Sequence, residues 1–235
     1  MSTVTTLVNP FEVQASNASG TYENCPQANY PAVIVGLIDL GTHPVTYSDG
    51  KSGEQRKAAL LIQIGDQYAK KADGDPFVYA REVSISSFGK KSSARKIAEA
   101  VLGKTFADEE KFNLCHLIGK PCMAEVKHNP GKEGKVYANL NSVSALAIGM
   151  AAPVPAVPTV LWFHGMGDFP THRWLPWSYG STLKQTYEDS AEYRAIHGGP
   201  AAGATVATTP AVAPMTATGQ TPSVAAGIPD DDVPF

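Results

Sequence analysis

Apolar residues between positions 30 and 143 fall into short runs, and turn-forming residues separate each run from the next. The runs predict strands near residues 30–38, 58–64, 77–85, 122–128 and 136–143. Gly, Pro, Asp and Asn gather between them and predict a loop at 41–53 and turns at 73–76 and 129–134. The pattern indicates a mainly β structure built from short strands.

One segment has a helical period instead. Between Ser92 and Gly103, apolar residues recur three or four positions apart, with Ser92 or Ser93 to cap the start and Gly103 to close the end. A second short helix is predicted at 108–112. Three strands, a helix and two strands is the order of the OB-fold, a five-stranded Greek-key barrel with a helix between strands three and four. Other small barrels fit the same order.

The last predicted strand has one polar face, formed by Lys135, Tyr137, Asn139 and Asn141. A ring that stacks on a base and a Lys that meets a phosphate are the elements of a surface for single-stranded nucleic acid. The same face also fits an ordinary solvated side of a barrel. In the third strand, Tyr79 and Arg81 extend the surface if they point outward, and the Tyr79 ring is core if it points inward.

Basic side chains cluster beside the predicted strands in three places: Arg56 with Lys57, Lys90 and Lys91 with Arg95 and Lys96, and Lys127 with Lys132 and Lys135. The net charge is −3, yet residues 30–148 hold 16 Lys and Arg against 13 Asp and Glu. Such pairs are usually only solvated, but three of them beside one face favour a phosphate-binding groove. The candidate DNA-binding residues are therefore Arg56, Lys57, Tyr79, Arg81, Lys90, Lys91, Arg95, Lys127, Lys135, Tyr137 and Asn139.

The C-terminal part departs from a simple barrel. Residues 151–199 predict a Pro-rich connection, an added strand at 160–164 and a helix from about 175 to 193, packed on the barrel or swapped to a neighbouring subunit. Residues 200–229 contain no charged and no aromatic residue, so we expect a disordered linker. The chain ends in an acidic and aromatic tip, Asp230, Asp231, Asp232, Val233, Pro234 and Phe235.

Two resemblances follow from these residues. The tip resembles the C-terminal peptide of bacterial single-stranded DNA-binding proteins, which implies recruitment of replication and repair enzymes. Residues 30–147 resemble a family of bacteriophage single-stranded DNA-binding proteins with an OB-fold. The segments that carry this resemblance are Tyr30–Ala32, Ile38–Thr42, Arg56–Lys57, Val83–Lys96, Leu102–Phe106, Asp108–Glu110, Leu117–Cys122 and Lys135–Ala138. The strand and helix at 151–199 are a departure from the family.

Several classes of function have no support in the sequence. No Walker-type phosphate loop, dinucleotide-binding glycine motif or His-Glu-x-x-His motif is present, so we expect neither a cofactor nor an enzyme. Cys115, His116 and Cys122 lack a fourth ligand at zinc-finger spacing, so no metal site is predicted. Three cysteines without a repeated spacing favour a reducing cytoplasm. The first 20 residues do not have the composition of a signal peptide, and no apolar run predicts a membrane span.

The sequence predicts an OB-fold single-stranded DNA-binding domain at 1–150, with an arm of about 20 residues, then an extension at 151–199, a linker at 200–229 and a partner-binding tip at 230–235. The predicted function is sequence-independent coating of single-stranded DNA in phage replication, recombination and repair, in the cytoplasm of the host cell. Two alternatives remain open: a protein-interaction scaffold and an RNA chaperone of the cold-shock type. The oligomeric state is also open.

Overall fold

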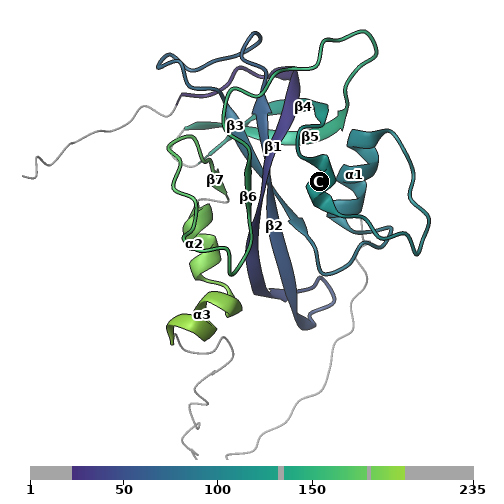
Figure 1. Cartoon of the computed structure of the whole chain (residues 1–235), viewed down its shortest axis with the longest axis vertical. Coiled ribbons are helices and arrows are strands. Elements are labelled where there is room, and N and C mark those ends of the chain that lie inside the picture. The colour runs from purple at the N-terminus through teal and green to yellow at the C-terminus, as the bar shows by residue number, and fades with distance from the viewer. Residues whose placement is uncertain (1–22, 132–134, 179–180, 199–235) are drawn as a thin grey trace, which may run out of the picture. The chain divides into compact units, whose positions relative to one another are not determined.

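The computed structural model describes residues 23–131, 135–178 and 181–198. Its strands are β1 (Ala28–Thr46), β2 (Ser52–Ile64), β3 (Val78–Ser84), β4 (Pro121–Pro130), β5 (Val136–Ala145), β6 (Val160–Trp162), β7 (Trp177–Ser178) and β8 (Ser181–Thr182). Its helices are α1 (Ser93–Leu102), the 3-10 helix η1 (Leu114–Leu117), α2 (Leu183–Glu188) and α3 (Ala191–His197). The predicted mainly β structure is confirmed (Figure 1).

Five strands form one antiparallel path in the order β3-β2-β1-β4-β5, and β6 adds to β1 in parallel. The long strand β1 is the centre of this sheet, because it pairs with β2 along one edge and with β4 and then β6 along the other. Within the described residues, β3 and β5 are the two ends of the path and do not pair with each other. The sheet is therefore open between these two strands.

The predicted loop at 41–53 is wrong for most of its length. β1 continues to Thr46 and β2 begins at Ser52, so only the short connection between them is a turn. The two strands pair out to Thr46 opposite Ser52, beyond the buried part of the sheet. Gly and Pro in this stretch indicated a loop, but backbone pairing of a projecting hairpin tolerates both at its exposed end.

The helix predicted after the third strand is confirmed as α1, and Gly103 closes it in the left-handed conformation at φ 61°. The second predicted helix, at 108–112, is absent, and η1 follows it instead at Leu114–Leu117. The Glu110 carboxylate turns back to accept a hydrogen bond from the N–H of Ala107. Asn113 accepts one from the N–H of Cys115 and so caps the later helix.

The sheet is covered on both faces, by a different part of the chain on each. The inner core packs α1 and the segment around Phe106 against residues such as Ile34, Leu60 and Ile62. The outer core packs β6 and α2 against the opposite face of β1 and β2. The residues of that face, such as Val33, Val35 and Leu61, alternate along the strands with those of the inner core. In Figure 1, α1 and the pair α2–α3 accordingly lie on opposite sides of β1 and β2.

The C-terminal extension differs from its predicted form after β6. A helix from about 175 to 193 is wrong, because β7 (Trp177–Ser178) pairs with β8 (Ser181–Thr182) and two short helices follow. Thr182 starts α2 with a capping box to Gln185, and the Ser190 hydroxyl accepts the N–H of Tyr193 at the start of α3. Two N-cap residues eight positions apart therefore divide the expected helix. β6 pairs with β1 of its own chain at Gly36–Ile38, so the extension packs on the sheet.

The linker and tip predicted at 200–235 lie outside the described residues, as does the N-terminal arm. Among the helices that are described, none has the length and apolar character needed to cross a lipid bilayer.

Candidate nucleic-acid interface

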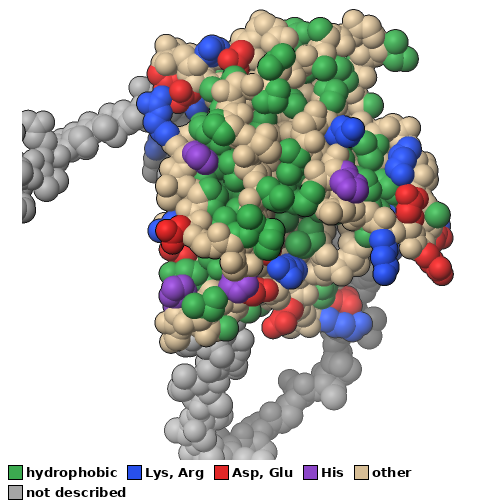
Figure 2. Space-filling model, viewed as in Figure 1, with side chains coloured by type: hydrophobic (Ala, Val, Ile, Leu, Met, Phe, Trp, Pro, Cys, Tyr) green, Lys and Arg blue, Asp and Glu red, His purple; other side chains and the backbone are tan. Residues whose placement is uncertain are grey.

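A groove of about 690 Å³ opens at one end of the sheet. One wall is the segment from Lys111 to His116, and the opposite wall is β6 with the following residue, Phe163. The floor comes from β1, β2 and the end of β3, with Leu37, Ala58 and Ile85. Figure 2 shows hydrophobic side chains gathered down the middle of this face, with Lys, Arg and His at its sides.

The wall formed by β6 presents large apolar side chains to solvent. Phe163 is 50% exposed and Leu161 is 41% exposed, whereas Trp162 between them is buried in the outer core. This alternation is that of a strand, with one side anchored and the other free. The Trp162 ring packs against Phe169 and Tyr187, with centroid distances of 4.9 and 4.7 Å. These aromatic contacts anchor the buried side of β6.

The opposite wall is also aromatic. Phe112 stacks on Phe88 with ring centroids 5.7 Å apart and lies 4.9 Å from Phe106. His116 approaches the Phe112 ring edge-on at 5.8 Å. These contacts hold Phe112 and His116 on the groove side of the loop. The groove therefore has ring surfaces on both walls, which suit flat, unpaired bases.

Arg56 supplies a fixed positive charge at the groove. Its Nη2 donates to Oδ2 of Asp39 at 2.5 Å and its Nε to Oδ1 at 3.4 Å, while the side chain stays about half exposed. The hydrogen bonds to Asp39 raise the pKa of Arg56 further above its ordinary value. Arg56 is thus held at one edge and open at the other, where its remaining N–H groups can meet a phosphate.

A bulge in β1 places Asp39 beside Arg56. The register with β2 shifts between Asp39 and Gly41, and Gly41 has φ 77°, a conformation that favours glycine. The N–H of Gly41 donates to Oδ1 of Asp39 at 3.0 Å. Bulges bend a strand and re-aim its side chains, so this local sequence decides where Asp39 points.

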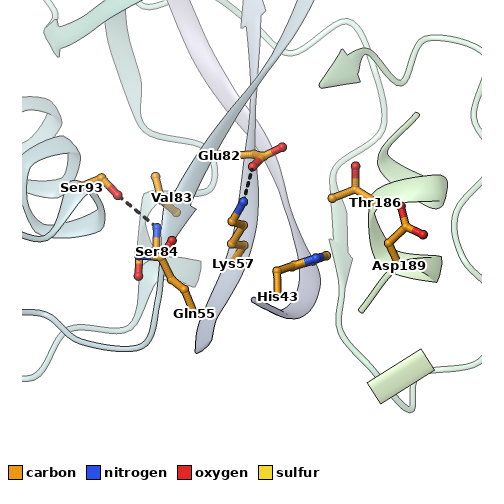
Figure 3. A pocket seen from close by; sticks show the side chains of 9 residues that line it. All are labelled: His43, Gln55, Lys57, Glu82, Val83, Ser84, Ser93, Thr186 and Asp189. Carbon is orange, nitrogen blue, oxygen red and sulfur yellow. Dashed lines mark hydrogen bonds and ion pairs between the residues drawn. The ribbon is translucent and has the colours of Figure 1, made fainter. Parts of the chain in front are cut away.

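A second, more polar cleft of about 440 Å³ lies near the same end of the sheet, between the β1–β2 hairpin and α2. Figure 3 shows Lys57 next to Glu82, and the two form an ion pair at 3.6 Å. Ser93 at the start of α1 accepts the N–H of Ser84 at 3.0 Å. Thr186 and Asp189 face these residues from α2. The cleft contains both signs of charge, and His43 supplies a ring at its side.

Of the first two predicted basic clusters, Arg56 alone lines the groove. Arg56 is joined to the end of β3 through the hydroxyl of Ser86, at 2.7 Å, and Lys90 and Lys91 lie exposed in the loop that follows β3. Lys57 is adjacent in sequence but belongs to the polar cleft. Lys90 also pairs with Asp108 at 2.9 Å, so part of its charge is already compensated.

Arg95 is a correction. Its side chain is only 2% exposed, and it binds Glu99 at 2.9 Å and the backbone oxygen of Phe106. Glu99 in turn accepts the N–H of Phe106 at 3.0 Å. Arg95 therefore ties the first turn of α1 to the backbone of Phe106, and its side chain is not available to a phosphate. In the sequence it was grouped with surface lysines because a helical arginine gives no sign of which way it points.

The third strand does not have Tyr79 and Arg81 pointing outward, which was one of its two interpretations from the sequence. Tyr79 packs against the inner core, as the partner of Ile62 in the register of β2 and β3. Arg81 shares that face and is partly buried. The neighbouring Val78 and Ala80 face the outer core, which the C-terminal extension covers. Neither side of β3 is thus an open platform for bases.

The predicted polar strip on β4 and β5 is present, but at the other end of β1. Lys127 lies opposite Asn139 and Asn129 opposite Tyr137, and Tyr137 is 44% exposed. Lys135 is exposed just before β5. Val126 pairs with Ala28 and Arg56 pairs with Thr42, so roughly 45 Å of β1 separates the two basic regions at about 3.3 Å per residue.

Charge in this strip is largely compensated. Glu125 accepts hydrogen bonds from Asn141 at 2.5 Å and from Ser142 at 2.8 Å, and it pairs with Lys127 at 3.1 Å. The hydrogen bonds from Asn141 and Ser142, followed by the one from Lys127, lower the pKa of Glu125 to about 2. Lys127 therefore has a permanent anionic partner at neutral pH.

The sequence analysis missed most of the groove. Lys111, Phe112, His116, Leu161 and Phe163 were not among the predicted site residues, although they form both walls. The signal that was available is Phe163, an aromatic residue directly before the Gly-rich stretch 164–167. Nothing local indicated that this segment would face residues 111–116. Within the described residues, no group of three or more His, Cys, Asp and Glu is placed to hold a metal ion.

Comparisons with known proteins leave the family open. No protein-family model matches this sequence, and no curated protein is similar enough to it to count as a match.

Proposed function

We propose that this protein binds single-stranded DNA without regard to sequence, and that the groove is its main contact. The observation that supports the proposal is the combination in one groove of rings on two walls, exposed at Phe163 and His116 and partly buried at Phe112, with cations beside them. Phe163 lies on one wall, Phe112 and His116 on the other, and Arg56 and Lys111 supply the charge.

Each part of the groove has a physical task in this function. Cations at Arg56 and Lys111 meet phosphates and release condensed counterions, which gives affinity that falls as salt rises. The rings stack on bases, which contributes about 1–3 kcal/mol per base and tolerates every base because each has a π-face. Paired bases in a duplex do not present these faces, so the groove favours a single strand.

We also propose that the sheet is an OB-fold barrel of the phage single-stranded DNA-binding type. The strand order β3-β2-β1-β4-β5, with α1 between β3 and β4, supports this assignment. On this proposal the protein coats DNA during replication, recombination and repair in the host cytoplasm. The covered outer face of β1–β3 is a departure from a bare barrel, and it leaves the groove beside β6 as the open surface.

The C-terminal tip has two proposed roles. Asp230–Asp232 with Val233-Pro234-Phe235 matches the charge and apolar character of the groove, so the tip competes with DNA in the free protein. When DNA displaces it, the tip recruits replication and repair proteins. A flexible linker of about 30 residues, as the composition of 200–229 predicts, has a root-mean-square span of roughly 30 Å. Removal of residues 227–235 should leave DNA binding at least as tight, and weaker binding would contradict the competition.

A protein-interaction scaffold is the second candidate, and the apolar character of the groove favours it. Exposed Leu161 and Phe163 with neighbouring Met166 are also what a protein partner would bury. The RNA chaperone alternative uses the same stacking physics. Both make different predictions for an oligonucleotide titration.

The experiment is a fluorescence-anisotropy titration of labelled oligo-dT at low and high salt, with duplex DNA and oligo-U as competitors. We expect tight, salt-sensitive binding that the duplex does not displace and that oligo-U displaces less well than oligo-dT. Absence of binding at low salt would reject the function and favour the scaffold. Stronger competition by oligo-U would favour the RNA chaperone.

A further inference from the structure

A chain of contacts joins the last described helix to the groove. Glu192 on α3 accepts two hydrogen bonds from Thr42 of β1, one from its N–H and one from its hydroxyl, both at 2.7 Å. Thr42 follows Gly41, whose N–H donates to Asp39, and Asp39 holds Arg56. Glu192 and Arg56 are therefore connected through three consecutive steps along the bulge of β1.

The bulge has little room to adopt another geometry. A Cβ on Gly41 would lie 2.5 Å from Cβ of Ser190 and 2.8 Å from Oε2 of Glu192. Ser190 is fully buried and caps α3, so this helix start packs directly on the bulge. Burial raises the pKa of Glu192, but the hydrogen bonds from Thr42 outweigh burial and leave the pKa below its ordinary value. The carboxylate that grips Thr42 is thus ionised at neutral pH.

We propose that Glu192 is a positioning residue for the groove: by binding both donors of Thr42 it fixes the bulge of β1 and so holds Asp39 and Arg56 in the geometry that meets a phosphate. The effect on DNA binding rests on the proposed function. The contacts that run from Glu192 through Thr42 and Asp39 to Arg56 do not depend on it. Glu192 does not touch the ligand. It acts through the backbone of β1, in the same way that outer contacts orient the ligands of other sites.

The sign of one substitution separates this role from simple electrostatics. Glu192 is an anion near a surface that binds an anion, so its long-range field alone disfavours DNA, and its removal should tighten binding. The positioning role predicts the opposite. Glu192→Ala loses both hydrogen bonds to Thr42, frees the bulge and weakens oligo-dT binding about threefold or more, the size of coupling expected between residues in one network.

A conservative variant should restore the geometry. In Glu192→Gln, the amide oxygen can accept the N–H of Thr42 while the amide NH₂ donates to the Thr42 hydroxyl. We expect binding equal to or slightly tighter than wild type, because the contacts survive and a negative charge is lost. Glu188→Ala is the matched control, since it removes a carboxylate of α2 that pairs with Lys184 at 3.5 Å, whereas the hydrogen bonds from Thr42 go to Glu192.

The experiment measures oligo-dT affinity for these three variants, alone and combined with Arg56→Gln, together with their melting temperatures. The loss in Glu192→Ala should disappear when Arg56 is already replaced, because Glu192 acts through that side chain. Tighter or unchanged binding of Glu192→Ala would overturn the proposal. An equal loss in the Arg56→Gln background would overturn it as well, because the effect would then be general destabilisation.

A measurement without DNA keeps the two proposals distinguishable. The Nε–H of Arg56 donates to Asp39, so its nitrogen-15 NMR signal in the full chain reports whether the guanidinium is held. We expect the signal to shift and exchange faster with solvent in Glu192→Ala, and to return in Glu192→Gln. If wild type fails to bind oligo-dT while this signal responds, the proposed function is rejected and the positioning role stands. An unchanged signal rejects the positioning role.

Discussion

The two ends of β1 contain similar residue types and differ in how those residues are arranged. At the Arg56 end, rings from two distant segments face each other across a groove, and Lys111 and Arg56 stand beside them. At the Lys127 end, Tyr137 and Asn139 lie on an open strip, and Glu125 neutralises the nearest lysine. Composition alone would rate the second region as the better nucleic-acid surface. Enclosure by rings favours the first, since Arg56 is paired with Asp39 much as Lys127 is paired with Glu125.

Removal of one ring at each end tests the comparison most strongly. Phe163→Ala should weaken oligo-dT binding about tenfold or more, because stacking contributes about 1–3 kcal/mol per base. Tyr137→Ala should change affinity far less. Anisotropy titrations of both variants give the comparison, and Phe163→Leu controls for lost apolar area without a ring. Equal losses from the two alanine variants would contradict a single main contact.

Displacement of the β6 wall should have the next largest effect. A Cβ on Gly36 would lie 2.5 Å from the carbonyl oxygen of Val160, so Gly36→Ala must push β6 away from β1. We expect a loss of about 1–3 kcal/mol in the free energy of unfolding, with weaker DNA binding because Phe163 moves with β6. Urea denaturation and anisotropy measure the two effects.

Gly89→Ala is the matched control for this substitution, since a Cβ there meets no atom within 4 Å. It should leave both unfolding and binding unchanged. Retention of wild-type affinity in a destabilised Gly36→Ala would show that β6 is not part of the interface.

Charge at the two ends should differ in its effect on salt dependence. Lys111→Gln should reduce the slope of log K against log salt by about 0.7, the value for one phosphate contact on a single strand. Lys127→Gln should leave the slope nearly unchanged, because Glu125 already compensates that lysine. Titrations at four salt concentrations measure both slopes. A larger change in Lys127→Gln would move the phosphate path to the β4–β5 strip.

The smallest effect concerns stability at the Lys127 end. The folded pKa of Glu125 is about 2, below the ordinary value of about 4.3. A lowered carboxyl pKa stabilises the fold above the unfolded pKa, and this stabilisation is lost as pH falls from about 4.3 toward 2. The melting temperature of wild type should therefore exceed that of Glu125→Gln at pH 6 and approach it near pH 2. A difference that stays constant with pH would reject the network around Glu125.

The elements of the inner core could be predicted from the sequence, and those of the outer core only in part. α1 has a clear period with a closing glycine, and β3, β4 and β5 were placed within a few residues. β2 is apolar at nearly every position from Ala58 to Ile64. Such a run indicates that both faces of the strand are buried. The second face is covered by the C-terminal extension, which begins about 90 residues later.

The site was harder to predict than the fold, because it depends on which distant segments meet. Arg56 was found by its charge, but Arg95 has the same charge and is buried against Glu99. Phe163 became a candidate only once β6 paired with β1 and left it facing residues 111–116. Pairing of a three-residue strand across more than 120 positions leaves no periodic signal in the sequence.

Photo-crosslinking of the full chain to oligo-dT that contains 5-bromodeoxyuridine, followed by mass spectrometry, tests the central claim most directly. The account predicts crosslinks at Phe163 and at Phe112 or His116, and their loss when unlabelled oligo-dT competes. Crosslinks confined to Tyr137 and its neighbours on β4 and β5, with none in the groove, would contradict it.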